Sequence, residues 1–399
     1  MKRSKKRNRV LLAALLVLSI LMLSACGAKT SSNGEAASGA TEVALVCSAA
    51  GKNDNGYNQS AIEGLTKVAS ELKIAYKVVE TSDALSVPDA LKQMASGGVK
   101  LIFSLEYDFD ALIKGVGGEK PLAEQFPDTT FVVFNAQPNV DEAGKTIHKN
   151  VISVLFNVHE SSYLAGYLSV LVNENLGKLF DAAAYGFDTD QAKNRLLGFV
   201  GGTASDGITV FSIGYYEGVN EAAKELGVNY ELIQKLDAGF ADAAVGSSFA
   251  QSVYTAGGNI VYSVAGNVGT GVTSKAADTK RLAIEVDANK DDVRPGNVLT
   301  SVLKNTNVPV SDLVMKYKDG TLKDSEALLN YTLKSGATGI TDLSAISKKI
   351  TADGKVTWDE IKTKVDAIRA KIENGEIKVT NAQLGEAFDP ASLTNATIK

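Results

Sequence analysis

The stretch VALVCSAAGKNDNGYNQSAIEGLTKVASEL, residues 43–72, contains the unit from which the rest of the fold can be predicted. Residues 43–47 form a short apolar run, which is typical of a strand buried on both faces of a parallel sheet. After a polar loop, apolar residues return at helical spacing on one face, at Ile62, Leu65, Val68, Ala69 and Leu72. The stretch therefore predicts a buried strand followed by an amphipathic helix.

The same alternation of strand and helix runs through the chain twice. Five β-rich runs are followed by five more, with helical stretches between them: 43–47, 76–79, 100–103, 130–134 and 151–156, then 196–200, 230–233, 259–263, 282–286 and 298–302. Strands that alternate with helices form parallel sheets joined by right-handed crossovers. We therefore expect an α/β protein with two Rossmann-like lobes, which is either an enzyme or a binding protein.

The N-terminus has the features of a lipoprotein signal peptide. Six basic residues within positions 2–9 precede an apolar segment, residues 10–23, that is too short to span a bilayer as a mature helix. The run Leu23-Ser24-Ala25-Cys26 fits cleavage ahead of a lipidated cysteine. We expect residues 1–25 to be removed and lipid on Cys26 to anchor the protein on the extracytoplasmic face of the cell membrane. The alternative is an ordinary secretory signal, or a short membrane anchor, with a chance cysteine.

The segment after the signal peptide, residues 26–41, is rich in Ser, Ala, Gly and Asn and predicts a flexible linker. The formal net charge of −5 includes the basic signal segment, so the remainder is more acidic still, which argues against nucleic acid as a partner. Cys26 and Cys47 are the only cysteines. Because Cys47 lies in the first apolar run, we expect it to be a buried core residue rather than a nucleophile.

Motifs for catalysis or cofactor binding are scarce. The stretch Gly266 to Gly271 follows a strand as a phosphate-binding loop does, but its order is GxxGxG, and a tight turn explains it equally well. His148 and His159 are the only histidines, and we expect both to be surface or packing residues. A His/Cys zinc set and a GxSxG elbow are missing from the sequence. We therefore expect no metal, no cofactor and no catalytic residue, and we favour a binding protein.

Six further segments occur in an order that is found in one family. They are Asp54 to Ser60, Tyr163 to Tyr167, Gly198 to Gly202, Ala265 to Val272, Val298 to Lys304 and Lys371 to Val379. These segments resemble the D-x-S-F-N-Q, Y-L-A-G, G-F-V-G-G, glycine-loop, V-L-T-S-x-x-K and C-terminal elements of the basic membrane protein (BMP) family. Members of that family are lipoproteins that bind nucleosides for ABC transporters.

The resemblance implies a type I periplasmic-binding-protein fold, in which the chain crosses three times between two lobes. We place the crossings near Asn157, Val302 and Asp324. The N-lobe is then expected to comprise residues 42–156 plus 303–324, and the C-lobe residues 157–302 plus 325–399. Ligand is expected between the lobes, at the carboxyl ends of the strands.

The resemblance also implies ligand-binding residues from both lobes. Tyr57 and Phe240 match aromatic residues that stack on the base, while Asp287 and Lys304 match a carboxylate and a lysine that hold the ribose. Gly266 matches a glycine whose backbone approaches the ligand. The alternatives are core packing for the two rings and a structural ion pair between Asp287 and Lys304.

The positions beside these residues bear on the choice of base. Asn58 can contact the ligand, cap the following helix, or do both. Two aspartates of the family are replaced here by Ser48 and Asn135, and Glu285 and Asn267 stand where glycines are common. Because asparagine donates as well as accepts, we expect a base with a donor and an acceptor side by side, such as adenine. Glu285 and Asn267 are expected to narrow the cleft.

We therefore expect a monomeric, membrane-anchored binding protein that captures a nucleoside, with purines favoured, by hinge closure. Its partners are expected to be the permease and ATPase subunits of an ABC importer. A ligand-presenting receptor or adhesin of the same fold is the main alternative, because both roles use the same cleft. A second alternative is an exported nucleoside-processing enzyme. Such an enzyme requires a cluster of carboxylates or metal ligands, and no such cluster is evident in the sequence.

Overall fold

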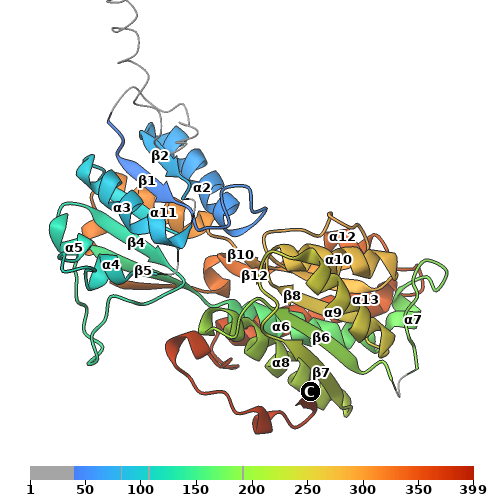
Figure 1. Ribbon diagram of the computed structural model, residues 1–399. Coiled ribbons are helices and arrows are strands. Elements are labelled where there is room, and N and C mark those ends of the chain that lie inside the picture. The colour runs from blue at the N-terminus through green and yellow to red at the C-terminus, as the bar shows by residue number, and fades with distance from the viewer. Residues whose placement is uncertain (1–39, 82, 107, 191–192) are drawn as a thin grey trace, which may run out of the picture.

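The computed structural model describes residues 40–81, 83–106, 108–190 and 193–399. The predicted signal peptide, Cys26 and nearly all of the predicted linker lie outside these residues. In Figure 1 the chain forms two lobes, each built on a sheet with helices packed against it. No helix within the described ranges is long and apolar enough to cross a membrane. The predicted α/β class with two parallel sheets is confirmed.

The first lobe contains a six-stranded, entirely parallel sheet with the order β11-β5-β4-β3-β1-β2. Its strands are β1 (Val43–Val46), β2 (Tyr76–Val79), β3 (Leu101–Ser104), β4 (Thr130–Phe134), β5 (Val151–Phe156) and β11 (Leu328–Tyr331). Its helical elements are α2 (Tyr57–Leu72), η1 (Ala84–Ser86), α3 (Val87–Ser96), α4 (Asp110–Ile113), α5 (Leu122–Gln125), α11 (Asn307–Lys318) and η2 (Leu322–Asp324). The five strands predicted for this half are all present.

The second lobe contains a seven-stranded sheet with the order β12-β10-β9-β8-β6-β7-β13, in which only β12 is antiparallel to its neighbour. Its strands are β6 (Leu196–Gly201), β7 (Tyr230–Lys235), β8 (Ile260–Val264), β9 (Leu282–Asp287), β10 (Val298–Lys304), β12 (Thr338–Ile340) and β13 (Ala396–Ile398). Its helical elements are α6 (Val158–Asn173), α7 (Leu176–Leu179), α8 (Asp206–Leu226), α9 (Ala243–Thr255), α10 (Asn267–Asp278), η3 (Leu333–Ser335), α12 (Ser344–Ser347), α13 (Lys355–Glu373), η4 (Ala382–Leu384) and η5 (Pro390–Ser392). The other five predicted strands are present here.

The expected lobe boundaries need correction at β10 and β11. Strand β10 continues in the second sheet as far as Lys304, beyond the crossing predicted near Val302. Strand β11 pairs with β5 of the first sheet, although residues 325–399 were expected in the second lobe. The reason is local packing, because the ring of Tyr331 lies 6.1 Å from that of Phe156. The chain therefore leaves the first sheet after β11, not near Asp324.

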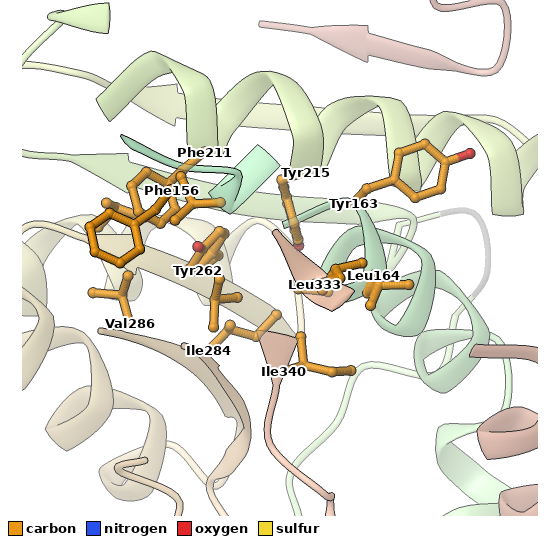
Figure 2. Packing of buried hydrophobic residues seen from close by; sticks show 14 of the residues in the cluster. Phe156, Tyr163, Leu164, Phe211, Tyr215, Tyr262, Ile284, Val286, Leu333 and Ile340 are labelled. Carbon is orange, nitrogen blue, oxygen red and sulfur yellow. The ribbon is translucent and has the colours of Figure 1, made fainter. Parts of the chain in front are cut away.

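The core of the second lobe depends on a close contact between α6 and α8. A Cβ atom placed on Gly166 would lie 2.1 Å from the Tyr215 carbonyl oxygen, so only glycine fits there. Figure 2 shows Phe211 and Tyr215 pointing from α8 toward Tyr262 and Ile284 of the sheet. The tyrosine rings of residues 215 and 262 are 5.2 Å apart. The glycine of the Tyr163 to Tyr167 segment therefore has a packing role.

The N-terminus of α2 is capped by Asp54, which lies ahead of the helix. Its carboxylate accepts hydrogen bonds from the backbone N–H groups of Gly56 (3.1 Å), Asn58 (2.8 Å) and Gln59 (3.1 Å). These groups have no acceptor within the first turn of the helix, so a carboxylate there satisfies the donors and complements the helix dipole. Asp54 thereby fixes the direction in which α2 leaves the loop after β1.

Replacing Asp54 with alanine is expected to lower the free energy of unfolding by about 1–2 kcal/mol, because the N-terminal donors lose their acceptor. Urea denaturation measures this. Glu63→Ala is the matched control, since it removes an exposed carboxylate that accepts only from the Gln59 side chain, at 2.9 Å on the same helix. Equal effects of the two substitutions would contradict the capping role.

Candidate functional site

The candidate site lies where the carboxyl ends of β1 and β4 in the first lobe approach those of β9 and β10 in the second. Tyr57, the first residue of α2, is 7% exposed, and its hydroxyl accepts a hydrogen bond of 2.6 Å from Asn135 Nδ2. The Tyr57 carbonyl accepts another, of 2.8 Å, from the Thr306 hydroxyl. Thr306 lies between β10 of the second sheet and α11 of the first lobe, so the start of α2 is bonded to the segment in which the chain passes from one lobe to the other.

Asn58 and Ser48 are bonded to each other rather than directed at a ligand. The Asn58 side-chain oxygen accepts from Ser48 N at 2.9 Å, and its Nδ2 donates to Ser48 Oγ at 2.9 Å and to the Gly51 carbonyl at 3.0 Å. Asn58 is fully buried. Of the two roles considered for Asn58, the capping role belongs to Asp54, and the amide instead holds the loop after β1 in shape.

Asn135 combines unusual backbone geometry with an unpartnered polar atom. It has φ +64°, in the left-handed region that asparagine tolerates better than most residues. Its side chain is buried. The amide Nδ2 donates to the Tyr57 hydroxyl, and the amide Oδ1 has no hydrogen-bond partner. A buried acceptor without a donor is unfavourable, so Oδ1 can accept a hydrogen bond from any N–H or O–H group that reaches this edge.

Lys304, the last residue of β10, lies among three aromatic rings. Its Nζ is 5.4 Å from the ring centroids of Tyr57 and Phe156 and 5.7 Å from that of Phe211. The side chain is 8% exposed, and burial lowers the pKa of Lys304 to about 8, although nearby Asp287 opposes the shift. No salt bridge in the described part of the chain includes this ammonium group. The structural ion pair considered for Lys304 is therefore not formed.

Asp287, the last residue of β9, lies across from the first lobe. A Cβ placed on Gly56 would lie 3.3 Å from Asp287 Cβ, so glycine at the start of α2 permits this approach. Burial raises the pKa of Asp287, while the positive charges of Lys290 and Lys304 act in the opposite direction. The backbone of Asp287 also has positive φ, +71°. A carboxylate held at the edge of the sheet, near a lysine with no salt bridge, can accept from two adjacent hydroxyls.

Phe240 and Gly266 lie together in the second lobe. The Phe240 side chain is 48% exposed, so it does not belong to the core, and its ring occupies the space beside Gly202. Gly266 has φ +53°, and a Cβ there would lie 3.0 Å from the Phe240 carbonyl oxygen. That carbonyl accepts from Asn267 N at 2.8 Å. Gly266 therefore shapes the loop that presents Phe240.

Glu285 and Asn267 contact their own lobe rather than narrowing a cleft. The Glu285 carboxylate accepts a short hydrogen bond from the Thr273 hydroxyl of α10, and Lys290 Nζ lies 3.7 Å from it. The Asn267 amide donates to the Ala241 carbonyl at 2.8 Å. Both side chains stabilise packing around α10.

The remaining titratable candidates have packing roles. His148 lies 2.8 Å from the Ile113 carbonyl, and burial lowers the pKa of His159 to about 4. Cys47 is fully buried, and burial raises the pKa of its thiol to about 12, which leaves it unreactive. Within the described ranges, no three His, Cys, Asp or Glu side chains are placed to hold a metal ion together.

Four features of the site were not predicted from the sequence. They are Asp54 as the helix cap, Gly56 opposite Asp287, the rings of Phe156 and Phe211 around Lys304, and a hydrogen bond of 2.7 Å from Gln383 Nε2 to the Asn135 carbonyl. Asp54 carried a recognisable signal, since an acidic residue precedes the helix. The others depend on segments brought together only by folding.

Comparison with known proteins places these features in a family. The protein-family model described as "ABC transporter substrate-binding protein PnrA-like" matches residues 41–383 of this chain. The ABC transporter nucleoside-binding protein BmpA of Lactococcus lactis subsp. cremoris is 28% identical over 384 residues, covering 88% of this chain and 99% of the relative. Basic membrane protein A of Borreliella burgdorferi is 26% identical over 384 residues, covering 96% of this chain and 98% of the relative.

The fold has solved counterparts. An ABC transporter solute-binding protein from Aeropyrum pernix has a TM-score of 0.67 at 21% sequence identity. The matched region covers 84% of this chain and 92% of the Aeropyrum chain. The arabinose-binding protein AraP of Geobacillus stearothermophilus has a TM-score of 0.53 at 12% identity, covering 77% and 99%. These likenesses confirm the type I periplasmic-binding-protein fold.

Proposed function

This chain belongs to the PnrA-like ABC transporter substrate-binding proteins, and we propose that its ligand is a purine nucleoside held between the two lobes. The family comprises binding proteins rather than enzymes, so the residues of the candidate site serve recognition. Within the BMP family, one similar protein is named as nucleoside-binding, which supports this class of ligand.

One observation supports the proposal most directly. Groups suited to a sugar and groups suited to a base meet at the same boundary between the lobes. Asp287 lies against Gly56 of the first lobe, one residue before Tyr57, whose ring lies 5.4 Å from Lys304 Nζ. A nucleoside joins a polar sugar to a flat base, so it can reach all of these groups at once.

In this proposal Asp287 and Lys304 hold the ribose. The carboxylate accepts from the two adjacent hydroxyls and the ammonium donates to the sugar oxygens, which are charge-assisted hydrogen bonds. Gly266 keeps the Phe240 loop close to the ligand without a side chain of its own. Ser48 and Asn58 contribute indirectly, because their mutual hydrogen bonds hold the loop that precedes Tyr57.

The base is proposed to lie between Tyr57 of the first lobe and Phe240 of the second. Stacking of a base on an aromatic ring contributes roughly 1–3 kcal/mol. About half of the Phe240 side chain is exposed, and Tyr57 is held in place by hydrogen bonds to Asn135 and Thr306. The unpartnered Asn135 Oδ1 provides one uncharged acceptor for a donor on the base, such as the amino group of adenine, while the Nδ2 donor is engaged by Tyr57.

Capture then occurs by closure of the lobes around the nucleoside, followed by delivery to the transporter's permease and ATPase subunits. We propose that lipid on Cys26 and the linker of residues 26–41 keep the binding protein at the membrane where that transporter lies. The lobes supply recognition and the membrane subunits supply translocation, so the binding protein needs no chemistry of its own.

Titration calorimetry with adenosine, inosine, guanosine, cytidine and ribose tests this proposal. We expect adenosine to bind tightest, and free ribose roughly 100-fold more weakly, because it lacks the stacked base. Asn135→Asp is expected to reverse the preference toward guanosine and inosine by about tenfold, since a carboxylate only accepts and those bases present N–H donors.

Asn229→Asp is the control for the added charge, because Asn229 is exposed on the second lobe. It should leave the order of ligands unchanged. Tighter binding of guanosine or inosine by the unmodified protein would contradict the role of Asn135. Absence of binding by every nucleoside would contradict the proposed function.

A further inference from the structure

The C-terminal segment of residues 377–386 joins the two lobes at the proposed base-binding edge. It follows α13 and lies on α8 of the second lobe, where Thr380 N and Oγ1 donate to the Glu217 carboxylate at 3.0 and 2.6 Å. Its middle forms the short turn η4, from which Gln383 Nε2 donates to the Asn135 carbonyl of the first lobe at 2.7 Å.

The turn that carries Gln383 is held by its own hydrogen bonds. Asn381 Oδ1 accepts from Gln383 N at 3.2 Å, and Asn381 N donates to the Glu386 carboxylate at 2.8 Å. Glu386 is also 2.9 Å from Lys378 Nζ. Beyond the turn, Asn395 N donates to Asn220 of α8 at 2.7 Å, and β13 joins the second sheet. Gln383 is therefore presented by a segment fixed to the second lobe on both sides.

The residue that accepts this hydrogen bond, Asn135, is also the one whose side-chain Oδ1 has no hydrogen-bond partner. Asn135 N donates to the Val154 carbonyl at 2.9 Å, and its side chain reaches Tyr57. A left-handed backbone is unfavourable for an L-residue, even for asparagine, and is maintained by support from its surroundings. The Gln383 amide supplies part of that support by fixing the peptide plane that follows Asn135.

We propose that Gln383 is a positioning residue that orients the Asn135 amide toward the ligand from the opposite lobe. The inference rests on the proposed function, in which Asn135 Oδ1 contacts the base. Gln383 does not contact the ligand itself. Because Gln383 belongs to the second lobe, the orientation of the Asn135 amide in the first lobe depends on the second lobe. The Asn135 amide is therefore fully oriented for the base only when the two lobes are in contact.

A double-mutant cycle with adenosine as the probe tests the proposal. Gln383→Met keeps the length of the side chain and removes its donor, and we expect adenosine affinity to fall threefold to tenfold, the effect of one neutral hydrogen bond. In an Asn135→Gly background, where glycine tolerates the left-handed backbone, the same substitution should have almost no further effect, because the amide to be oriented is gone. An equal loss in both backgrounds, or no loss in either, would overturn the proposal.

Gln251→Met is the matched control, since Gln251 donates only to Thr255 at 2.9 Å on the exposed face of α9. Amide hydrogen exchange of the ligand-free protein separates this inference from the function. Gln383→Met should speed exchange in residues 134–140, and Gln251→Met should not. If the unmodified protein binds no nucleoside, the proposed function is wrong, and the hydrogen-exchange result alone then tests the positioning role of Gln383. Unchanged exchange in residues 134–140 would then overturn the role of Gln383.

Discussion

Replacing Asp287 with asparagine is expected to weaken adenosine binding roughly 100-fold. The carboxylate of Asp287 can accept from two sugar hydroxyls, and hydrogen bonds to a charged group contribute about 1.5–3 kcal/mol each. Asparagine has the same shape but one acceptor oxygen and no charge. It also tolerates the left-handed backbone at φ +71°, which alanine does not, so it isolates the loss of charge. Titration calorimetry measures the change.

The same substitution is not expected to destabilise the ligand-free protein. Burial raises the pKa of Asp287 above its ordinary value of 3.8, so ionisation is less favourable in the folded chain than in the unfolded one. This cost is fully present above the folded-state pKa and disappears as the pH falls below the unfolded value. An asparagine amide is neutral at every pH, so the variant does not have this cost of ionisation. The melting temperature of Asp287→Asn at pH 7 should therefore equal or exceed that of the unmodified protein.

Asp292→Asn is the control, because it makes the same chemical change at an exposed residue of the following loop. It should leave adenosine affinity unchanged. If Asp287→Asn keeps the affinity of the unmodified protein, the sugar does not bind at the end of β9. A lower melting temperature for Asp287→Asn would instead show that the carboxylate stabilises the fold.

The fold was largely predictable because its central strands are continuous apolar runs. A strand covered by helices on both faces is expected to be apolar along nearly its whole length. Residues 43–46 are all apolar, and residues 151–156 are apolar except for Ser153, so such runs stand out from their neighbours. The strands at Leu328–Tyr331, Thr338–Ile340 and Ala396–Ile398 are three or four residues long and lie at sheet edges. Their identity depends on partners far away in the chain, so no local pattern predicted them.

The candidate site was predictable only one lobe at a time. Residues that follow strands, such as Asn135 and Asp287, could be located because parallel sheets bring their carboxyl ends to one edge. The contacts between lobes could not be located in this way. Asn135 and Gln383 are 248 positions apart in the chain, and neither neighbourhood indicates that they meet. Asn58 was ambiguous for a different reason, because an amide near a helix start can bond equally well to ligand, helix or loop.

The second large effect is expected at Lys304, as a dependence of binding on pH. Burial lowers the pKa of Lys304 to about 8, so the ammonium is present at neutral pH and is lost at moderately alkaline pH. Only the charged form donates strongly to the sugar and attracts Asp287. Adenosine affinity is therefore expected to fall about tenfold between pH 7 and pH 9. Adenosine is the appropriate probe because its base keeps one protonation state over this range.

The stability of the ligand-free protein should change in the opposite direction. The folded-state pKa of about 8 is lower than the ordinary value of 10.5, so the unfolded chain binds more protons between these two values. The free energy of unfolding contributed by Lys304 therefore rises with pH across this window. Affinity that falls while stability rises distinguishes titration of Lys304 from general alkaline unfolding.

Lys304→Met separates the charge from the packing. Methionine is flexible and apolar, so it can fill the space among the Tyr57, Phe156 and Phe211 rings without the ammonium. We expect adenosine affinity at pH 7 to fall roughly 30-fold and the pH profile to become flat. Lys316→Met is the control, because that lysine lies outside the site, 3.3 Å from Asp312 on α11. If Lys304→Met protein still loses affinity between pH 7 and pH 9, the titrating group is another residue and Lys304 does not hold the sugar.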